Sequence, residues 1–175
     1  SVQHMQRTGR WRGGAVPYGY REEKSGAGFR LVPDEETAAV LREIVDRVID
    51  GESVQAIAED LNARGVLTPA DVQRERHGKP VRGAKWDVSN LIRVLRSERM
   101  LGYEVHADGS RVTDSVGLPV RRAEPLITEA KFRELQAELD RRRKPLGMVR
   151  RNAAMLRHIA FCRCGQPLYQ IRVQS

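Results

Sequence analysis

The sequence predicts an α+β protein, a small helical domain of the helix-turn-helix type with short antiparallel strands. Three observations indicate this class. Segments 34–51, 53–65 and 86–97 place apolar side chains at helical spacing on one face. Segments 18–22 and 29–32 are rich in strand-forming residues and flank a glycine-containing turn at 24–28. Near the end, Cys162 and Cys164 lie two positions apart between two further strand-like segments, 155–161 and 167–173.

The first 17 residues carry little that could form a core. Residues 1–5 have the composition of an expression-tag remnant and are left out of the fold. Residues 6–17 form a basic linker arm, in which Arg10 and Arg12 flank a tryptophan and two glycines permit sharp backbone turns. This composition fits a solvated terminal arm and a basic arm lying along DNA equally well.

A long helix is predicted to begin after Pro33. Proline followed by three acidic residues is a strong helix start, because carboxylates are favourable at the positive end of the helix dipole. Gly51 ends this helix. Its apolar stripe consists of Thr37, Leu41, Ile44, Val45, Val48 and Ile49.

Two shorter helices follow, separated by a polar loop that contains Pro69, Gly78, Pro80 and Gly83. Ser53 caps the first, which presents Val54, Ile57, Ala58 and Leu61 on one face. The second presents Val88, Leu91, Ile92 and Leu95 on its apolar face, and Ser89, Asn90, Arg93 and Arg96 on the opposite one. An Asn/Arg outer face is what a helix-turn-helix DNA reader needs, although the long loop departs from the tight turn of that motif. The same spacing also fits an ordinary amphipathic pair.

Charge favours the DNA-binding interpretation. The net charge is +8, but it is unevenly placed: residues 34–60 hold nine acidic and two basic side chains, whereas residues 141–175 hold nine basic side chains and no acidic one. The arm and the segment 61–100 are also basic. Separate basic segments with an acidic back are typical of a nucleic-acid binder, so we expect duplex DNA as the partner.

The sequence after residue 97 predicts a short strand, a turn and one further helix. Residues 102–106 are predicted to form a strand, residues 107–110 a turn, and residues 111–122 a loop or hairpin. Thr128 caps a helix with the stripe Phe132, Leu135 and Leu139. That helix runs into Arg141, Arg142, Arg143 and Lys144, which suit the negative end of a helix dipole and also suit phosphate contact. Residues 145–151 are a linker candidate.

Several motifs occur in a recognisable order: Gly13-Gly14-x-x-Pro17-Tyr18-Gly19-Tyr20, Gly51-x-Ser53-x-x-x-Ile57-Ala58-x-x-Leu61-Asn62-x-x-Gly65-Val66-x-Thr68-Pro69, Trp86, Ile92-x-x-Leu95-x-Ser97, Gly102-Tyr103 and Pro125-Leu126-Ile127. This order closely resembles the recombinase domain of large serine integrases, the site-specific recombinases of phages and mobile elements. The resemblance covers roughly residues 9–169. It ends at Cys162-x-Cys164-Gly165, which looks like the first knuckle of that family's zinc ribbon.

The resemblance implies a domain organisation. Residues 18–145 would be the recombinase, DNA-binding domain, and residues 146–175 a linker and the first half of a zinc-ribbon β-hairpin. Zinc sites are usually closed by four ligands, so we expect Cys162 and Cys164 to supply only a half-site, with zinc bound in the complete ribbon of the parent protein. We expect no required cofactor in this chain.

The resemblance also implies a function. The parent would exchange DNA strands through a phosphoserine intermediate formed by a separate amino-terminal catalytic domain, and this chain would recognise the attachment site without being an enzyme itself. Arg82 and Lys85 of the polar loop join the arm, the second helix and the basic run 141–144 as candidate DNA contacts. We expect the chain to be a monomer and its parent to act as a dimer or tetramer on DNA.

Two other functions remain open from the residues alone. One is a stand-alone helix-turn-helix regulator; the other is a metal-dependent nuclease that uses the cysteines and histidines. The four histidines are scattered without carboxylate partners at any recognised spacing, which provides no catalytic site. No signal peptide or membrane-spanning run is evident, so we expect a cytoplasmic protein. The resemblance to serine integrases further implies that it is nucleoid-associated and encoded by a bacterium or a phage.

Overall fold

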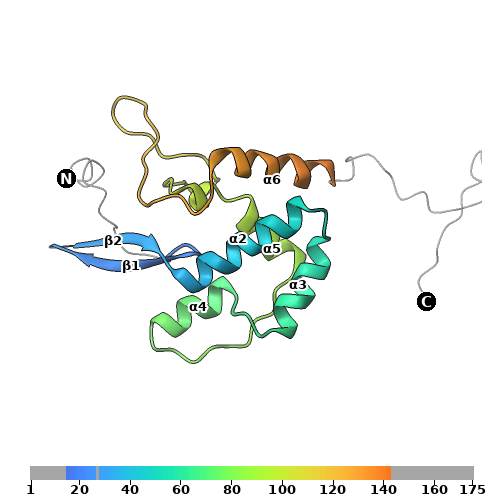
Figure 1. Ribbon diagram of the computed structural model, residues 1–175. Coiled ribbons are helices and arrows are strands. Elements are labelled where there is room, and N and C mark those ends of the chain that lie inside the picture. The colour runs from blue at the N-terminus through green and yellow to red at the C-terminus, as the bar shows by residue number, and fades with distance from the viewer. Residues whose placement is uncertain (1–14, 27, 143–175) are drawn as a thin grey trace, which may run out of the picture. The chain divides into compact units, whose positions relative to one another are not determined.

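The computed structural model describes residues 15–26 and 28–142. Along this part of the chain the elements are β1 (Tyr20–Ser25), β2 (Gly28–Pro33), α2 (Glu35–Ile49), α3 (Val54–Ala63), α4 (Pro69–Arg76), α5 (Val88–Leu95), the short 3-10 helix η1 (Glu98–Leu101) and α6 (Glu129–Arg141). Figure 1 shows their order, with the hairpin leading directly into α2. The α+β class is therefore confirmed. The zinc-ribbon segment, the linker 145–151 and the arm up to residue 14 lie outside the described residues.

The first two strands form an antiparallel hairpin in which Tyr20 lies opposite Pro33 and Ser25 opposite Gly28. The predicted boundaries were wrong at both strands. The first strand begins at Tyr20 rather than at residue 18, the second runs from Gly28 to Pro33 rather than from 29 to 32, and residues 24, 25 and 28 belong to the ladder rather than to the turn. Gly26 has a φ of +57°, a left-handed conformation that lets the chain reverse within a shorter turn than the composition indicated.

Helix α2 is the central support of the domain. Two acidic residues occupy its first turn, and its inner face is buried at the predicted positions. Of the predicted stripe, only Ile49 remains partly exposed. Helix α2 packs against α6 and α3, and α3 packs in turn against α5. The core buries apolar side chains from all of these helices, including Leu41, Ile44, Val48, Ile57, Leu61, Leu91, Leu95, Phe132, Leu135 and Leu139.

The loop predicted between the two shorter helices contains a further helix, α4. Thr68 caps it by accepting a hydrogen bond from the backbone N–H of Asp71, and Pro69 occupies the first turn, where its missing N–H costs nothing. The signal Thr-Pro-x-Asp was present in the sequence. The sequence does not predict this helix because its weak amphipathic pattern, with Val72 as its buried apolar side chain, is obscured by charged residues. The arrangement is therefore not a simple two-helix motif.

Helix α5 confirms two of the four residues of the predicted stripe. Leu91 and Leu95 are fully buried, and Val94 packs against the core, whereas Val88 and Ile92 are only partly buried and do not join it. Because α3 lies against one side of α5, the buried face is centred between Leu91 and Val94.

Residues 102–122 form an irregular, hairpin-like segment: isolated bridges replace the strand predicted at 102–106, whereas the turn predicted at 107–110 and the hairpin predicted at 111–122 are present. Its ladder consists of three isolated antiparallel bridges: Tyr103 with Arg121, Val105 with Arg111, and Thr113 with Pro119. Gly102 begins it with a φ of +79°, and the carbonyl oxygen of Gly102 accepts from the backbone N–H of Arg122 at 2.7 Å. Because each bridge involves a single residue pair, the sequence contains no run of alternating apolar and polar residues long enough to predict a strand.

Candidate nucleic-acid interface

The amino-terminal end of α5 is closed by Asp87 and Asn90. The Asp87 carboxylate accepts from the backbone N–H of Asn90 at 2.8 Å, and the Asn90 side-chain oxygen accepts from the backbone N–H of Asp87 at 3.2 Å. The Asn90 side-chain nitrogen also donates to the backbone carbonyl of Lys85 at 3.1 Å. The capping box and the bond to Lys85 thus use both the oxygen and the nitrogen of the Asn90 side chain, which the sequence suggested for base reading. To contact a base, Asn90 would have to give up these bonds.

The exposed face of α5 carries Ser89, Arg93 and Arg96, as predicted, but the two arginines differ. The Arg96 guanidinium donates to Asp140 at 2.7 Å and to the side-chain oxygen of Gln136 at 3.3 Å, both on α6. The side chain of Arg93 makes no hydrogen bond or ion pair with another residue in the described part of the chain. Arg93 is therefore the cation that α5 leaves available to an outside ligand.

A second set of available cations lies on residues 77–85, which we call the 77–85 loop. Every residue of this loop is exposed, and it contains Lys79, Arg82 and Lys85 but no acidic residue. None of these three side chains pairs with another described residue. The sequence predicts Arg82 and Lys85 as DNA contacts but not Lys79, because the weak pattern of α4 leaves the start of the loop undefined.

The chain that leads into β1 is fixed beside α4 and α5. The backbone N–H of Val16 donates to the side-chain oxygen of Gln73 on α4 at 3.1 Å. The Tyr18 ring meets Trp86 edge to face, with centroids 5.5 Å apart. Val16, Gln73 and Arg93 border one open groove. The described chain thus begins in contact with α4, at a groove whose lining also includes Arg93. Arg10 and Arg12 themselves lie outside the described residues.

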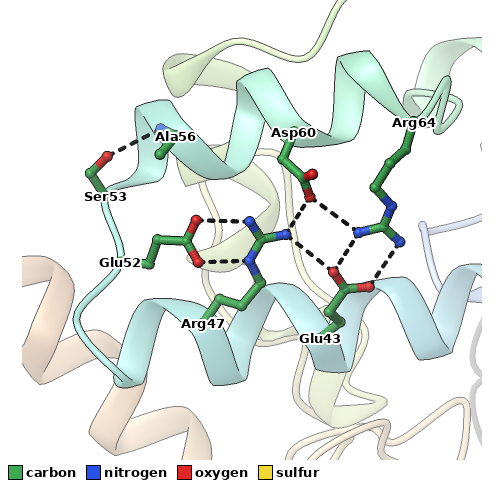
Figure 2. Close-up of polar contacts among 7 residues, drawn as sticks. All are labelled: Glu43, Arg47, Glu52, Ser53, Ala56, Asp60 and Arg64. Carbon is green, nitrogen blue, oxygen red and sulfur yellow. Dashed lines mark hydrogen bonds and ion pairs between the residues drawn. The ribbon is translucent and has the colours of Figure 1, made fainter.

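The acidic back of the domain is an ion network that joins α2 to α3 (Figure 2). Arg47 forms a two-pronged contact with Glu52, at 2.7 Å for each nitrogen, and also donates to Asp60 at 2.6 Å. Arg64 contacts Glu43 at 2.5 Å and 3.1 Å, and reaches Asp60 at 3.2 Å. The network contains three carboxylates and two guanidinium groups.

Hydrogen bonds from the arginines hold the carboxylates of this network in their charged form. The pKa of Glu43 is lowered chiefly by its hydrogen bond from Arg64, and the pKa values of Glu52 and Asp60 are lowered chiefly by hydrogen bonds from Arg47. The pKa of Arg47 is raised by the same contacts. The network retains one net negative charge, in keeping with the acidic composition of residues 34–60.

The carboxyl end of α6 contributes less than its sequence indicated. Arg141 is paired with Glu138 at 2.7 Å in the same helix, and Arg142 also has an interaction partner. Arg143, Lys144, Cys162 and Cys164 lie outside the described residues. Within residues 15–26 and 28–142, no group of three or more His, Cys, Asp or Glu side chains is placed to hold a metal ion. None of the helices in this range is long and apolar enough to cross a membrane.

These features define a small α+β domain that has an acidic back and carries unpaired cations, among its described residues, on α5 and on the 77–85 loop. The Recombinase family model matches residues 35–142, more than half of the chain, and the chain belongs to that family. This confirms the resemblance of its motifs to a recombinase domain.

The chain is also similar to solved structures, although no curated protein matches it. A crystal structure of an LSR–DNA complex is similar at 20% identity and a TM-score of 0.46, covering 83% of this chain and 39% of that one. A structure from work on the sequence requirements of the Listeria innocua prophage attP site is similar at 20% identity and a TM-score of 0.40, covering 89% of this chain and 58% of that one. The chain thus spans less than two thirds of either protein.

Proposed function

We propose that this chain is the part of a serine integrase that binds the attachment site, and that it recognises a specific duplex DNA sequence during site-specific recombination. The observation that carries the proposal is Arg93, exposed and unpaired among the described residues, on a helix whose opposite face is buried in a domain of the Recombinase family. Arginine pairs with guanine through two hydrogen bonds in the major groove, a contact worth about 1–3 kcal/mol of discrimination.

The surroundings of Arg93 support DNA as the ligand. The cations of the 77–85 loop and those of the arm would contact phosphates, which give affinity without sequence information. The acidic network of α2 and α3 forms a separate surface that would face away from the duplex. We assign no catalytic step to this chain; strand exchange through a phosphoserine would be carried out by a catalytic domain of the parent protein.

The test starts from a pool of randomised duplexes, because the attachment site is unknown. The purified chain should enrich one sequence, which is then compared with a scrambled duplex of the same composition over a range of salt concentrations. We expect tighter binding to the enriched duplex and a defined footprint on it. Enrichment of no sequence, with equal affinity for all duplexes, would contradict the proposal.

We further propose that residues 146–175 begin a zinc ribbon and that Cys162 and Cys164 provide two of its ligands. Two thiolates separated by one residue match one knuckle of such a site, and a complete site requires two further ligands. Zinc should therefore bind weakly to this chain, and a chelator should leave the melting temperature unchanged. A large decrease in melting temperature on chelation would show that other residues complete the site.

A further inference from the structure

The 77–85 loop has exposed side chains but a tightly held backbone. At its start, the Arg74 guanidinium donates to the carbonyl oxygen of Pro80 at 2.8 Å. After its end, the Asn62 side chain bonds both the N–H and the carbonyl of Trp86, at 2.8 Å and 2.9 Å. A loop fixed at both ends in this way has little freedom to lose when a ligand binds.

The central anchor of the loop is Asp71 on α4. This carboxylate is only 1% exposed, and it accepts from the backbone N–H of Arg82 at 2.8 Å and from that of Ala84 at 2.7 Å. Between them, Gly83 adopts a φ of +68°, a conformation that glycine tolerates at low cost. Successive backbone N–H groups around a left-handed residue form an anion-binding concavity. In this protein Asp71 already fills that concavity.

The filled concavity determines how the loop can bind an outside anion. The backbone donors of Arg82 and Ala84 face Asp71, so they are not free to bind a phosphate. The side chains of Lys79, Arg82 and Lys85 are exposed and unpaired among the described residues. With these two donors occupied, the loop offers an outside anion mainly the side chains of Lys79, Arg82 and Lys85, on a backbone that is already in place. Polymeric phosphate suits three separated cations better than a single small anion does.

We propose that the 77–85 loop is a preformed basic projection that contacts the phosphate backbone of the bound duplex, and that Asp71 is the residue that positions it. This inference rests on the proposed function and adds to it the residue, Asp71, that holds the phosphate-contacting loop in place. Asp71 acts through the loop and does not touch DNA. It is a negative charge whose presence strengthens the binding of a polyanion.

Because Asp71 is negatively charged, substituting it distinguishes two explanations, which predict opposite changes in DNA affinity. Asp71→Asn removes one negative charge, so electrostatics alone predicts tighter DNA binding. Positioning predicts weaker binding, because an asparagine nitrogen would face one of the two loop N–H groups. Glu75→Gln is the matched control: Glu75 is exposed on the same helix, and its side chain has no partner among the described residues. We expect Glu75→Gln to leave affinity unchanged or tighten it slightly, and Asp71→Asn to weaken it.

A double-mutant cycle separates positioning from general damage to the fold. Combined alanine substitution of Lys79, Arg82 and Lys85 should reduce the salt dependence of binding, by a slope of about 0.9 for each phosphate that the variant no longer neutralises. Asp71→Asn should weaken binding much less in that triple variant than in the wild-type chain. Arg93→Ala should have the same effect in both backgrounds. Equal weakening by Asp71→Asn with and without the loop cations would overturn the positioning role.

Hydrogen exchange on the unsubstituted chain keeps the proposal testable if Asp71→Asn does not fold. The amides of Arg82 and Ala84 should be protected although their side chains are exposed, whereas the amide of Lys85, which has no hydrogen bond among the described residues, should exchange faster. Unprotected amides at both Arg82 and Ala84 would overturn the anchor. If the triple variant keeps the full salt dependence of binding while Arg93→Ala loses its preference for the enriched duplex, the 77–85 loop does not contact phosphates. The proposed function is unaffected by that outcome. If the wild-type chain prefers no sequence, the proposed function itself fails.

Discussion

Arg96, the residue at the carboxyl end of α5, donates to Asp140 on α6 at 2.7 Å, across 44 residues of chain. The side chain of Arg93, one turn earlier on the same exposed face, makes no such contact among the described residues. The two arginines look equivalent in the sequence, but the ion pair gives them different roles. Arg96 joins two helices of the domain, whereas Arg93 remains available to a ligand.

The first prediction follows from that difference. Arg93→Ala should leave the melting temperature unchanged and reduce affinity for the enriched duplex much more than for the scrambled one, by about 1–3 kcal/mol of discrimination. Arg96→Ala should destabilise the fold by less than about 1 kcal/mol, because its ion pair is partly exposed. Thermal melting and binding titrations on both duplexes check each variant. Equal weakening on the two duplexes for Arg93→Ala would place base reading elsewhere.

The second prediction concerns the capping box of α5. Asn90→Ala should lower the free energy of unfolding by about 1 kcal/mol, since it removes a reciprocal cap and the bond to the Lys85 carbonyl. Ser89→Ala, one residue earlier and exposed, is the control and should change stability by no more than about 0.5 kcal/mol. Denaturant unfolding measures both. If the two substitutions are equally mild, the capping bonds contribute nothing.

The third prediction is an acid-induced loss of stability from the network of α2 and α3. Glu43, Glu52 and Asp60 have lowered pKa values in the folded chain. Their contribution is present above the ordinary values of 4.5 for glutamate and 3.8 for aspartate, and is lost as the pH falls through the lower folded values. Unfolding measured as a function of pH should show this decline. The decline in stability should be shallower in the Glu52→Gln variant. If this variant has the same pH profile as the unsubstituted chain, the network does not contribute to the acid-induced loss.

The fourth prediction compares two glycines with left-handed backbone. A Cβ added at Gly102 would lie 2.1 Å from the carbonyl oxygen of Ala123, whereas one added at Gly109 would meet nothing within 4 Å. Gly109→Ala should cost about 1–2 kcal/mol for the left-handed conformation alone. Gly102→Ala should cost clearly more, because the backbone must also move. Equal melting temperatures for the two variants would contradict the close approach at Gly102.

The fifth prediction concerns the arm, which precedes the described chain where Val16 is bonded to Gln73. Replacing Arg10 and Arg12 together by alanine should weaken binding and shorten the footprint at one end, because arginine arms enter narrow, negative minor grooves. The fold should be unaffected. A footprint of unchanged length would place the arm in solvent.

The sequence by itself determined the elements whose signals are local. The start of α2, the Ser53 cap of α3 and the stripe of α6 all depend on residues within a few positions of one another, and all three were predicted correctly. The hairpin was predicted too, but its boundaries were not, because alternation does not reveal where pairing stops. The order of motifs was enough to indicate the family.

The tertiary structure decided which of the candidate side chains are available to a ligand. Arg93 and Arg96 look alike in sequence, and only the position of α6 beside α5 makes one of them an internal ion pair. Asp71 was not a candidate at all, since its partners, the backbone N–H groups of Arg82 and Ala84, leave no trace in side-chain identity. Contacts between distant segments, and contacts made by backbone atoms, depend on how helices pack. Neither kind of contact is encoded in the spacing of residues along the chain.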